Sequence, residues 1–279
     1  MTGAALRHRL GALTLGERTL VMGIVNVTPD SFSESGLHAQ AQDAVAAALR
    51  LAEDGADILD IGGESTRPGH APVSADDEWA RIGPVLDGLT ASGRPLPPIS
   101  VDTTKAAVAR RAIAAGASIV NDIWGFQRDP DLAAIAAESK AAAVLMHNRD
   151  AIDAGIDIVA DMLRFLERSV EIAMRAGVGA DRIAIDPGIG FGKTLDQNYA
   201  AVAAIPRLKA LGFPVLLGVS RKSFIGRLFD PEPAPRQRGP GTIAANSFGV
   251  LLGADIIRVH DVAENVQALR VLERLRRAA

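Results

Sequence analysis

The chain has 279 residues, of which 48% are hydrophobic, and its formal net charge is −3 at pH 7. This near-neutral balance creates no overall basic field, so nucleic acid is excluded as an expected partner. Cysteine is absent, which excludes disulfides and thiolate metal ligands. Residues 1–19 lack the continuous apolar region of a signal peptide, and no stretch approaches the roughly 18 apolar residues of a membrane span. We therefore expect a soluble, cytoplasmic protein.

One repeating unit organises the chain from residue 20 onward. A helical segment ends at a glycine, a short apolar run follows, and the run stops at a polar residue, as in 55–60, 116–121 and 253–258. Such a glycine is typical of a helix C-cap, and an unbroken apolar run is typical of a strand buried on both faces. In chain order, strands are expected near residues 20–27, 58–61, 98–101, 119–120, 142–146, 183–185, 214–217 and 255–259. Helices are expected between them, over residues 43–53, 75–90, 105–114, 131–137, 156–175, 198–211, 242–252 and 262–277.

These alternating strands and helices predict an α/β fold, a closed (β/α)8 TIM barrel. A single domain is expected over residues 1–279, because no change in composition marks a second one. Its core spans about residues 20–277, preceded by an N-terminal extension over 1–19. A doubly wound open sheet is the alternative architecture.

Polar side chains follow the predicted strands at the points where they end. In a barrel these ends converge on one mouth, where such enzymes keep their chemistry. Each residue taken singly could equally cap a loop or a helix, but carboxylates and cationic groups gathered on one rim favour a shared site. In strand order the residues are Asn26, Asp60, Asp102, Asn121, Asp122, His147, Asp186, Ser220, Lys222, Arg258 and His260.

Two further segments could mislead. Residues 188–194 end like a phosphate-binding P-loop, but that loop requires a glycine where this chain has Pro187. Proline removes an N–H group that a phosphate cradle would use, so we predict a site loop with a glycine hinge instead of a nucleotide site. The Pro- and Arg-rich residues 230–241 are expected to form a flexible surface loop before the seventh helix.

Several long segments carry a family resemblance. They are MGIVNVTPDSFS (22–33), DIGGESTRPG (60–69), ISVDT (99–103), VNDI (120–123), DPGIGFGKT (186–194), SRKSFIG (220–226) and RVH (258–260). In this order, from residue 20 to the last helix, they resemble the dihydropteroate synthase family. The resemblance implies a TIM barrel that joins 4-aminobenzoate to a dihydropterin methyl diphosphate in folate biosynthesis, and that is a target of sulfonamides. Two loops depart from the family pattern, at residues 33–36, around Glu34, and at 146–150, where Asn148, Arg149 and Asp150 follow the histidine.

The resemblance also assigns roles to residues. It implies that diphosphate is bound by Asn26, Thr66, Arg258 and His260, with Mg²⁺ on the Asn26 side-chain oxygen. It implies that the pterin is bound by Asp102, Asn121, Asp186 and Lys222, and that catalysis depends on Lys222, Arg258 and His260. It implies that the 4-aminobenzoate pocket is lined by Thr66, Arg67, Pro68, Phe191 and Ser220. Residues 28–38 and 65–73 are expected to close over the site, because they are long connections rich in Ser, Pro and Gly.

These assignments suit the chemistry of the groups. A carboxylate accepts two parallel N–H bonds from a guanidine-like pterin edge, and a leaving diphosphate needs cations and directed donors. For Arg258 the alternative is an ion pair with Asp60 or Asp255 inside the barrel. For Asp102 and Lys222 the alternative is a purely structural pair, and for Arg67 a solvated loop arginine.

Two other functions are left open. One is a pterin-dependent methyltransferase, and the other is a catalytically silent paralogue that binds a pterin. The expected partners are the two small-molecule substrates, without nucleic acid or membrane, and the resemblance implies a homodimer.

Overall fold

The structure is a computed structural model that describes residues 8–27, 34–65 and 72–278, without the side chains of 34–38. Thr66, Arg67 and Pro68, which were predicted to line the site, lie outside the described residues. Among the described residues, no helix is both long enough and apolar enough to cross a membrane.

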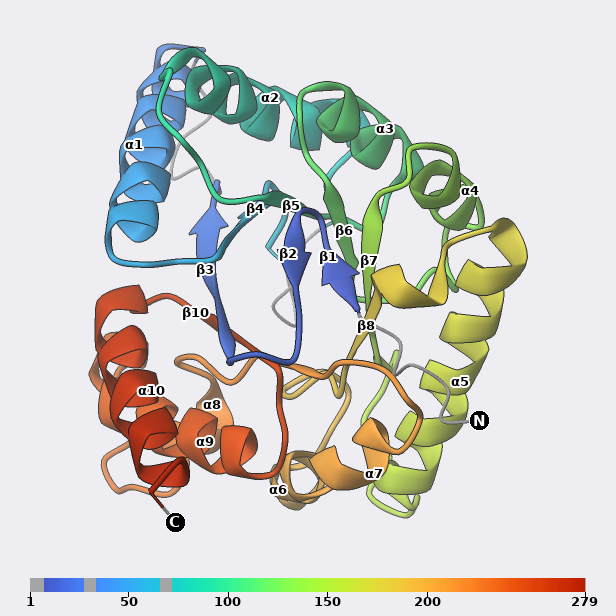
Figure 1. Cartoon of the computed structure of the whole chain (residues 1–279), viewed down its shortest axis with the longest axis vertical. Helices are drawn as coiled ribbons and strands as arrows, with labels where there is room; N and C mark the ends of the chain where they lie inside the picture. Colours follow the sequence, from blue (N-terminus) through green and yellow to red (C-terminus); the bar gives the residue numbers. More distant parts are fainter. Residues whose placement is uncertain (1–7, 28–33, 66–71, 279) are drawn as a thin grey trace.

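The centre of the molecule is an eight-stranded parallel barrel, seen along its axis in Figure 1. The strand order is β8-β7-β6-β5-β4-β3-β10-β9, and a parallel bridge between Ile185 and Val215 joins β8 to the β9 segment. Ile185 N also donates to Pro214 O at 2.9 Å, so the two ends of the sheet meet. The predicted TIM barrel is thus confirmed over the open sheet. The strands are β3 (Leu20–Asn26), β4 (Ile58–Gly62), β5 (Ile99–Asp102), β6 (Ile119–Asp122), β7 (Ala142–Met146), β8 (Ile183–Asp186), β9 (Leu216–Leu217) and β10 (Ile256–Val259).

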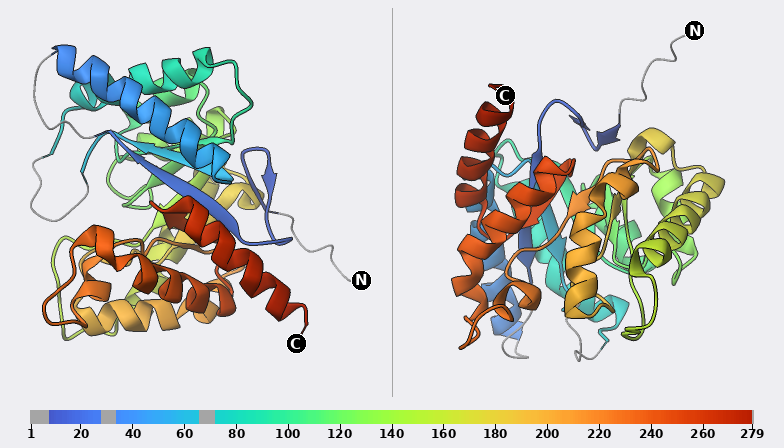
Figure 2. Two further views of the ribbon diagram at one scale, coloured as in Figure 1. Left: turned by 90° about the vertical axis from the view of Figure 1, so that its left-hand side faces the viewer. Right: turned by 90° about the horizontal axis from the view of Figure 1, so that it is seen from below.

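Helices surround the barrel on its outer face (Figures 1 and 2). They are α1 (Glu34–Glu53), α2 (Ala75–Ala91), α3 (Ala106–Ala114), α4 (Asp131–Glu138), α5 (Ile158–Ala176), α6 (Leu195–Ala203), α7 (Ile205–Lys209), α8 (Ser223–Gly226), α9 (Gly239–Leu251) and α10 (Val262–Arg276), with 3₁₀ turns η1 (Ala180–Arg182) and η2 (Pro235–Arg238).

Three segments differ most clearly from the prediction. Helix α1 begins at Glu34, whereas the helix was expected to begin at residue 43. The earlier residues were expected to be a loop, because they follow a segment rich in Ser, Pro and Gly. The expected helix over 198–211 is divided into α6 and α7, since Pro206 cannot donate to the helical ladder. The expected loop over 230–241 contains η2 and the start of α9. It also contains the buried Arg238, whose guanidinium donates to Arg221 O at 3.0 Å.

Alternate residues of each strand fill the barrel interior, as the two-residue period of a strand requires. The part of this interior near the amino ends of the strands is apolar. A hairpin of β1 (Arg9–Leu10) and β2 (Leu13–Thr14) packs against it through the fully buried Leu10. The hairpin covers the barrel end where the strands begin (Figure 2), so part of the expected N-terminal extension belongs to the core. The interior residues of this cluster are Leu20, Met22, Ile58, Ile119, Ala142, Val144, Ala184, Leu216 and Ile256.

Local capping fixes helix α5, which precedes β8, and helix α6, which follows the loop after β8. Helix α5 begins where the Asp157 side chain accepts from Val159 N and ends at Gly177, whose φ of 104° suits a residue without a side chain. Helix α6 begins with a capping box, in which Thr194 and Gln197 bond to each other's backbone N–H. The β8–α6 loop therefore ends at a defined point.

Candidate functional site

A layer of polar side chains lies next to the apolar cluster inside the barrel, on the side toward the carboxyl ends of the strands. The apolar cluster is the floor of this site. Moving two residues along a strand from a floor residue leads from Ile58 to Asp60, and from Ala184 to Asp186. Because side chains two apart in a strand share a face, these residues also point inward. The inward residues of this layer include Asp60, Ser100, Asp102, Asn121, Asp186, Gly218 and Arg258.

Arg258 lies at the centre of one half of this layer. Its Nε donates to Asp60 Oδ2 at 2.6 Å and its Nη2 donates to Asp102 Oδ2 at 2.7 Å. Asn121 Nδ2 donates to the same Asp60 oxygen at 3.1 Å. The structure therefore contains the Arg258–Asp60 ion pair that sequence analysis gave as the alternative. Asp255 takes no part in this cluster and pairs with Lys209 at 2.6 Å.

Burial and charge shift the pKa values in this cluster. Burial alone would lower the pKa of Arg258, but Asp60 and Asp102 raise it above its ordinary value, so the guanidinium stays charged. Asp60 is fully buried, and its Oδ1 has no hydrogen-bond partner among the described residues. An unpaired buried carboxylate oxygen is costly and is suited to accept a bond from a ligand.

Asp186 and Lys222 form the other half of the layer, and both lie beside Gly218. A methyl group added at Gly218 would lie 3.7 Å from Asp186 Oδ2 and 3.9 Å from Lys222 Nζ. Asp186 Oδ1 accepts from Gly188 N at 2.7 Å, which fixes the carboxylate in the β8–α6 loop. Without a side chain at residue 218, the backbone lies close to both an acceptor and a donor.

The same loop holds Lys222. Its Nζ donates to Ile189 O and lies 4.7 Å from the centre of the Phe191 ring, within cation–π range. Burial lowers the pKa of Lys222 to about 8, while Asp186 acts to raise it. Burial raises the pKa of Asp186, while Lys222 acts to lower it. Each group therefore favours the charged form of the other.

Ser220 and His260 lie together beside this half of the site. Ser220 Oγ and His260 Nδ1 are 3.0 Å apart, and His260 N donates to Ser220 Oγ at 3.2 Å. Asn26 is exposed at the end of β3, where it pairs in register with Gly62, which in turn pairs with Asp102. The structure therefore places Asn26 in the same row of the barrel as Asp102.

Two strand-end residues point away from the mouth. Asp122 accepts from Trp124 N at 2.9 Å and Phe126 N at 2.7 Å, so it caps a loop. His147 is fully buried, packs edge-on against Phe165 of α5 and lies 3.1 Å from Asp161 Oδ2. The expectation that all strand-end polar residues share one rim was wrong for these two, because the strand period turns them outward.

Sequence reasoning missed three elements of this site. They are Gly218 beside Asp186 and Lys222, the backbone carbonyl of Ile189 and the buried amine of Lys193. The only sequence signal for the first was a glycine between a strand and the Ser220–Lys222 segment. Backbone carbonyls leave no signal in side-chain identity, and the sequence around Lys193 resembles the end of a P-loop, which conceals its role.

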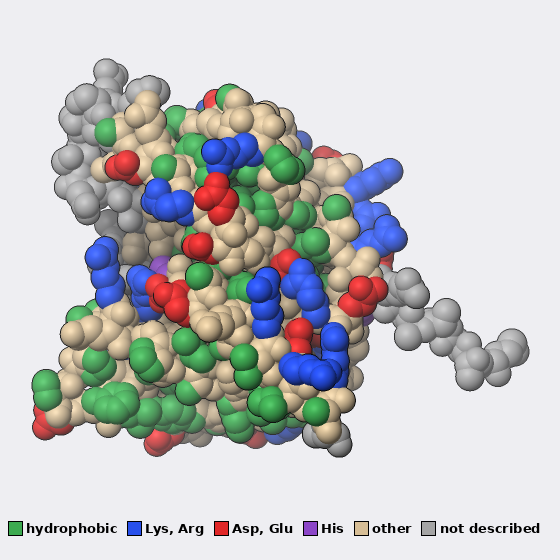
Figure 3. All heavy atoms as spheres, turned by 60° about the vertical axis from the view of Figure 1, so that its left-hand side comes forward, with side chains coloured by type: hydrophobic (Ala, Val, Ile, Leu, Met, Phe, Trp, Pro, Cys, Tyr) green, Lys and Arg blue, Asp and Glu red, His purple; other side chains and the backbone are tan. Residues whose placement is uncertain are grey.

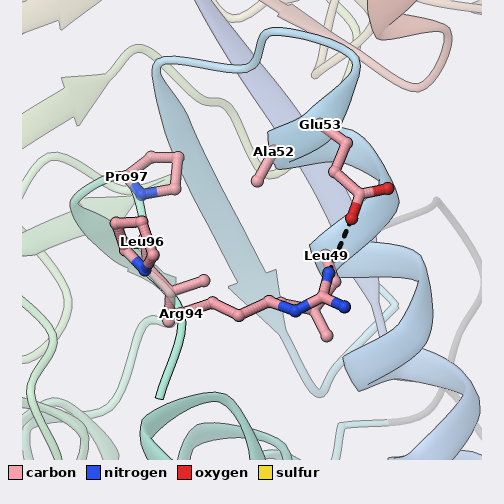
Figure 4. Close-up of a pocket in the computed structure, with 7 residues that line it drawn as sticks. Leu49, Ala52, Glu53, Arg94, Leu96 and Pro97 are labelled. Carbon is pink, nitrogen blue, oxygen red and sulfur yellow. Dashed lines mark hydrogen bonds and ion pairs between the residues drawn. The ribbon is translucent and has the colours of Figure 1, made fainter. Parts of the chain in front are cut away.

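A separate groove lies at the other end of the barrel. It has a volume of about 430 Å³ and is lined by the end of α1 and the segment before β5, including Leu49, Leu96 and Pro97. Figure 4 shows the Arg94–Glu53 ion pair across it, with a bond of 2.6 Å between exposed side chains. Because helices end and strands begin at this side, the groove lies away from the mouth.

The fold and the polar layer together define a class of protein. A closed (β/α)8 barrel carries inward carboxylates, an amide and two cations at the carboxyl ends of its strands, which is where enzymes of this fold bind and transform small molecules. Acceptors and a donor gathered in one layer suit a flat ring with N–H groups on one edge.

Comparisons with known proteins identify the family. The family described as pterin binding enzyme matches residues 22–260. Dihydropteroate synthase of Bacillus subtilis (strain 168) is 48% identical over 262 residues, covering 94% of this chain and 90% of that protein. The Xanthomonas albilineans dihydropteroate synthase solved with 4-aminobenzoic acid has a TM-score of 0.90 at 45% identity, covering 98% of this chain and 99% of that one. The Xanthomonas albilineans enzyme solved in complex with 7,8-dihydropteroate has a TM-score of 0.85 at 43% identity, covering 97% of this chain and 98% of that one. The chain belongs to the dihydropteroate synthase family of pterin-binding enzymes.

Proposed function

We propose that the protein condenses a dihydropterin methyl diphosphate with 4-aminobenzoate to give 7,8-dihydropteroate and diphosphate. The carbon–oxygen bond to diphosphate breaks, the arylamine nitrogen forms a bond to the same methylene carbon, and the amine loses a proton. The observation that carries this proposal is that the Asp186 carboxylate and the Lys222 amine both lie beside Gly218 in the inward polar layer, where each favours the charged form of the other.

Pterin recognition follows from that pairing. The ring edge presents adjacent N–H donors, which Asp186 Oδ2 can accept, while Lys222 Nζ can donate to the ring nitrogen and carbonyl on the other side. Asp102 and Asn121 offer further polar atoms from the neighbouring strands. A site built this way rejects an analogue without the matching N–H groups by roughly 10⁴-fold, because buried acceptors would stay unpaired.

Diphosphate binding falls to Arg258 and His260 at the end of β10. Two of the five N–H donors of Arg258 serve Asp60 and Asp102, so the ion pairs fix its orientation and leave further donors for an anion. Ser220 Oγ contacts both His260 Nδ1 and His260 N, so the hydroxyl fixes this side of the anion site.

The position of Asn26 fits Mg²⁺ as a minor protein ligand. Its side chain is exposed at the end of β3, and its amide oxygen is a hard donor of the kind this ion prefers. Among the residues described, no cluster of three His, Asp or Glu forms a metal site, so substrate phosphate oxygens and water would supply the other ligands. Bound there, Mg²⁺ would neutralise charge on the departing diphosphate.

The 4-aminobenzoate pocket would lie beside Phe191 and Ser220. Both residues adjoin Lys222, so an arylamine held there would face the methylene of a pterin bound at Gly218. Thr66, Arg67 and Pro68 are further pocket residues in this proposal and stay predictions. The Xanthomonas albilineans relative bound to 4-aminobenzoic acid supports the substrate class.

The chemistry assigned to the protein is electrostatic. Arg258 and His260 stabilise negative charge that develops on the leaving diphosphate, and the carboxylates stabilise positive charge that develops on the pterin. No covalent enzyme intermediate is required. The alternative of a pterin-dependent methyltransferase has no use for Arg258 and His260 as a diphosphate site, and turnover distinguishes the synthase from a silent pterin-binding paralogue.

Calorimetry with two ligands tests pterin recognition directly. We expect 6-hydroxymethyl-7,8-dihydropterin to bind, and the analogue with oxygen in place of the 2-amino group to bind far more weakly, because Asp186 then faces an acceptor. Equal affinities for both ligands would contradict the assigned ring edge.

We further propose a homodimer formed through α9 and α10. Hydrophobic side chains gather on the lower part of this face in Figure 3, and Phe248, Leu251, Val271 and Leu275 are each more than half exposed. A second copy of the chain would remove this apolar surface from water. Light scattering should give twice the monomer mass for the wild type and the monomer mass for Leu251→Glu; a monomeric wild type would contradict the proposal. The cytoplasmic location stays a prediction.

A further inference from the structure

The amine of Lys193 is buried and fully bonded within the β8–α6 loop. It lies 2.8 Å from His147 Nδ1 and donates to Gly188 O at 2.7 Å and Phe191 O at 3.2 Å. The residue is only 5% exposed. A protonated amine has three N–H groups, and here each one meets an acceptor. Lys193 therefore does not resemble the lysine of a P-loop, which points toward phosphate.

The two neighbours of the His147 ring, Lys193 and Asp161, determine which ring nitrogen accepts and which carries the proton. Burial lowers the pKa of His147 to about 3, so the ring is neutral. Burial lowers the pKa of Lys193 to about 7. In its charged form the amine can only donate, so Nδ1 accepts from Lys193 and the proton resides on Nε2, facing Asp161 Oδ2 at 3.1 Å. Arg149 Nη1 donates to the same Asp161 oxygen at 2.7 Å. Helix α5 thus orients His147, and His147 orients Lys193.

The loop needs such an anchor. Gly188, Gly190 and Gly192 all have positive φ, so the backbone from 187 to 193 is intrinsically permissive. A methyl group at Gly188 would fall 1.8 Å from His147 O, which shows how closely the loop packs on this strand end.

The groups that this loop positions are those proposed to hold the pterin. Gly188 N fixes Asp186, while Ile189 O and the Phe191 ring hold Lys222. The two carbonyls bonded by Lys193 belong to Gly188 and Phe191, on either side of Ile189. Because Lys193 holds the carbonyls of Gly188 and Phe191, it also fixes Ile189 O, which lies between them and accepts from Lys222.

We propose that Lys193 is a positioning residue for the reaction, which acts from behind the site by holding residues 188–191 against Asp186 and Lys222. The proposal rests on the function given above. It predicts that removing the amine weakens pterin binding even where the fold survives, since a displacement of about 1 Å remote from the chemistry can cost roughly 10²-fold.

Lys193→Met tests the proposal, because methionine keeps most of the side-chain volume and removes all three donors. The measurements are the Kd for the dihydropterin methyl diphosphate by calorimetry and the thermal midpoint of unfolding. We expect pterin binding about 10–100-fold weaker than in the wild type. A lowered midpoint with unchanged pterin affinity would show that Lys193 is only structural and would overturn the proposal.

Two variants of His147 provide a matched comparison that does not depend on the Lys193 variant folding. Asparagine can place an oxygen where Nδ1 was and so keep an acceptor for Lys193, whereas glutamine reaches the position of Nε2 and removes that acceptor. Both variants lose the same ring packing on Phe165. We expect His147→Asn to bind pterin more tightly than His147→Gln, and His147→Gln to weaken binding as Lys193→Met does. Equal affinities for the two His147 variants would overturn the proposal.

The wild type separates this inference from the proposed function. If the wild type neither binds the pterin diphosphate nor forms dihydropteroate, the proposed function fails. If the wild type does both and Lys193→Met binds pterin equally well, only the positioning role fails.

Discussion

Gly218→Ala is the most informative single substitution, because its added methyl group enters the space assigned to the pterin ring without disturbing the fold. The nearest atoms to that methyl group would be Asp186 Oδ2 at 3.7 Å, Arg258 Cβ at 3.9 Å and Lys222 Nζ at 3.9 Å, all ordinary contacts. The φ of Gly218 is not in the left-handed region, so alanine adopts the same backbone without strain. Stability should therefore be unchanged or raised by about 0.4–1 kcal/mol.

The expected effect on binding follows from the two groups beside Gly218. A ring lifted by a methyl group can no longer reach both Asp186 and Lys222, and a hydrogen bond stretched beyond about 3.5 Å is lost. Each bond to a charged group contributes about 1.5–3 kcal/mol, so losing two costs about 3–6 kcal/mol, or roughly 10²–10⁴-fold in Kd.

Calorimetry with the dihydropterin methyl diphosphate and a thermal melt check this prediction. Gly239→Ala is the control, because an added methyl group there meets no atom within 4 Å. Wild-type pterin affinity in a folded Gly218→Ala variant would refute the location of the ring.

Four further predictions concern charged groups of the barrel. Lys222→Met should lower kcat/KM by roughly 10²–10³-fold in a folded protein, and a thermal melt beside the kinetics would show whether folding is the cause. In the wild type, kcat/KM should fall as pH rises through about 8, since Lys222 then loses its proton; a pH profile flat to pH 10 would contradict this. Arg258→Met should lower the free energy of unfolding by about 3–5 kcal/mol in urea titrations, because Asp60 and Asp102 would be left buried without a cation, and an unchanged midpoint would exclude this. Burial raises the pKa of Asp122 to about 6, so the folded state binds its proton more tightly than the unfolded state. Stability from this group should therefore fall as pH rises from about 4 to 6, by up to about 3 kcal/mol, and Asp122→Asn should remove that slope from urea titrations.

The barrel itself could be predicted from the sequence because its strands are buried on both faces. An apolar run such as 142–146 gives β7 its bounds directly, since helices cover its outer side and floor residues its inner side. The strand expected over 214–217 is present as β9, but its short length and the division into α6 and α7 could not be predicted, because hydrogen bonding and not apolar pattern decides where these elements begin and end. The hairpin β1–β2 was missed since only Leu10 of its short strands is fully buried.

The site could be predicted only as far as strand ends determine it. Strand-end position identified Asp102, Asp186 and Arg258, but the same rule also included Asp122 and His147, which the two-residue period turns outward. Register cannot be read from a single sequence to within one residue, and a shift of one residue reverses the direction of a side chain. The contacts made by Ile189 O and Lys193 depend on loop conformation, which side-chain identity does not encode.

Diphosphate release by the purified protein tests the central claim most directly. The protein would be given the dihydropterin methyl diphosphate with and without 4-aminobenzoate, and diphosphate and dihydropteroate would be measured in the same samples. We predict release that requires 4-aminobenzoate, with dihydropteroate formed in equal amount. Binding of the pterin without release of diphosphate would contradict it and would identify a catalytically silent pterin-binding protein.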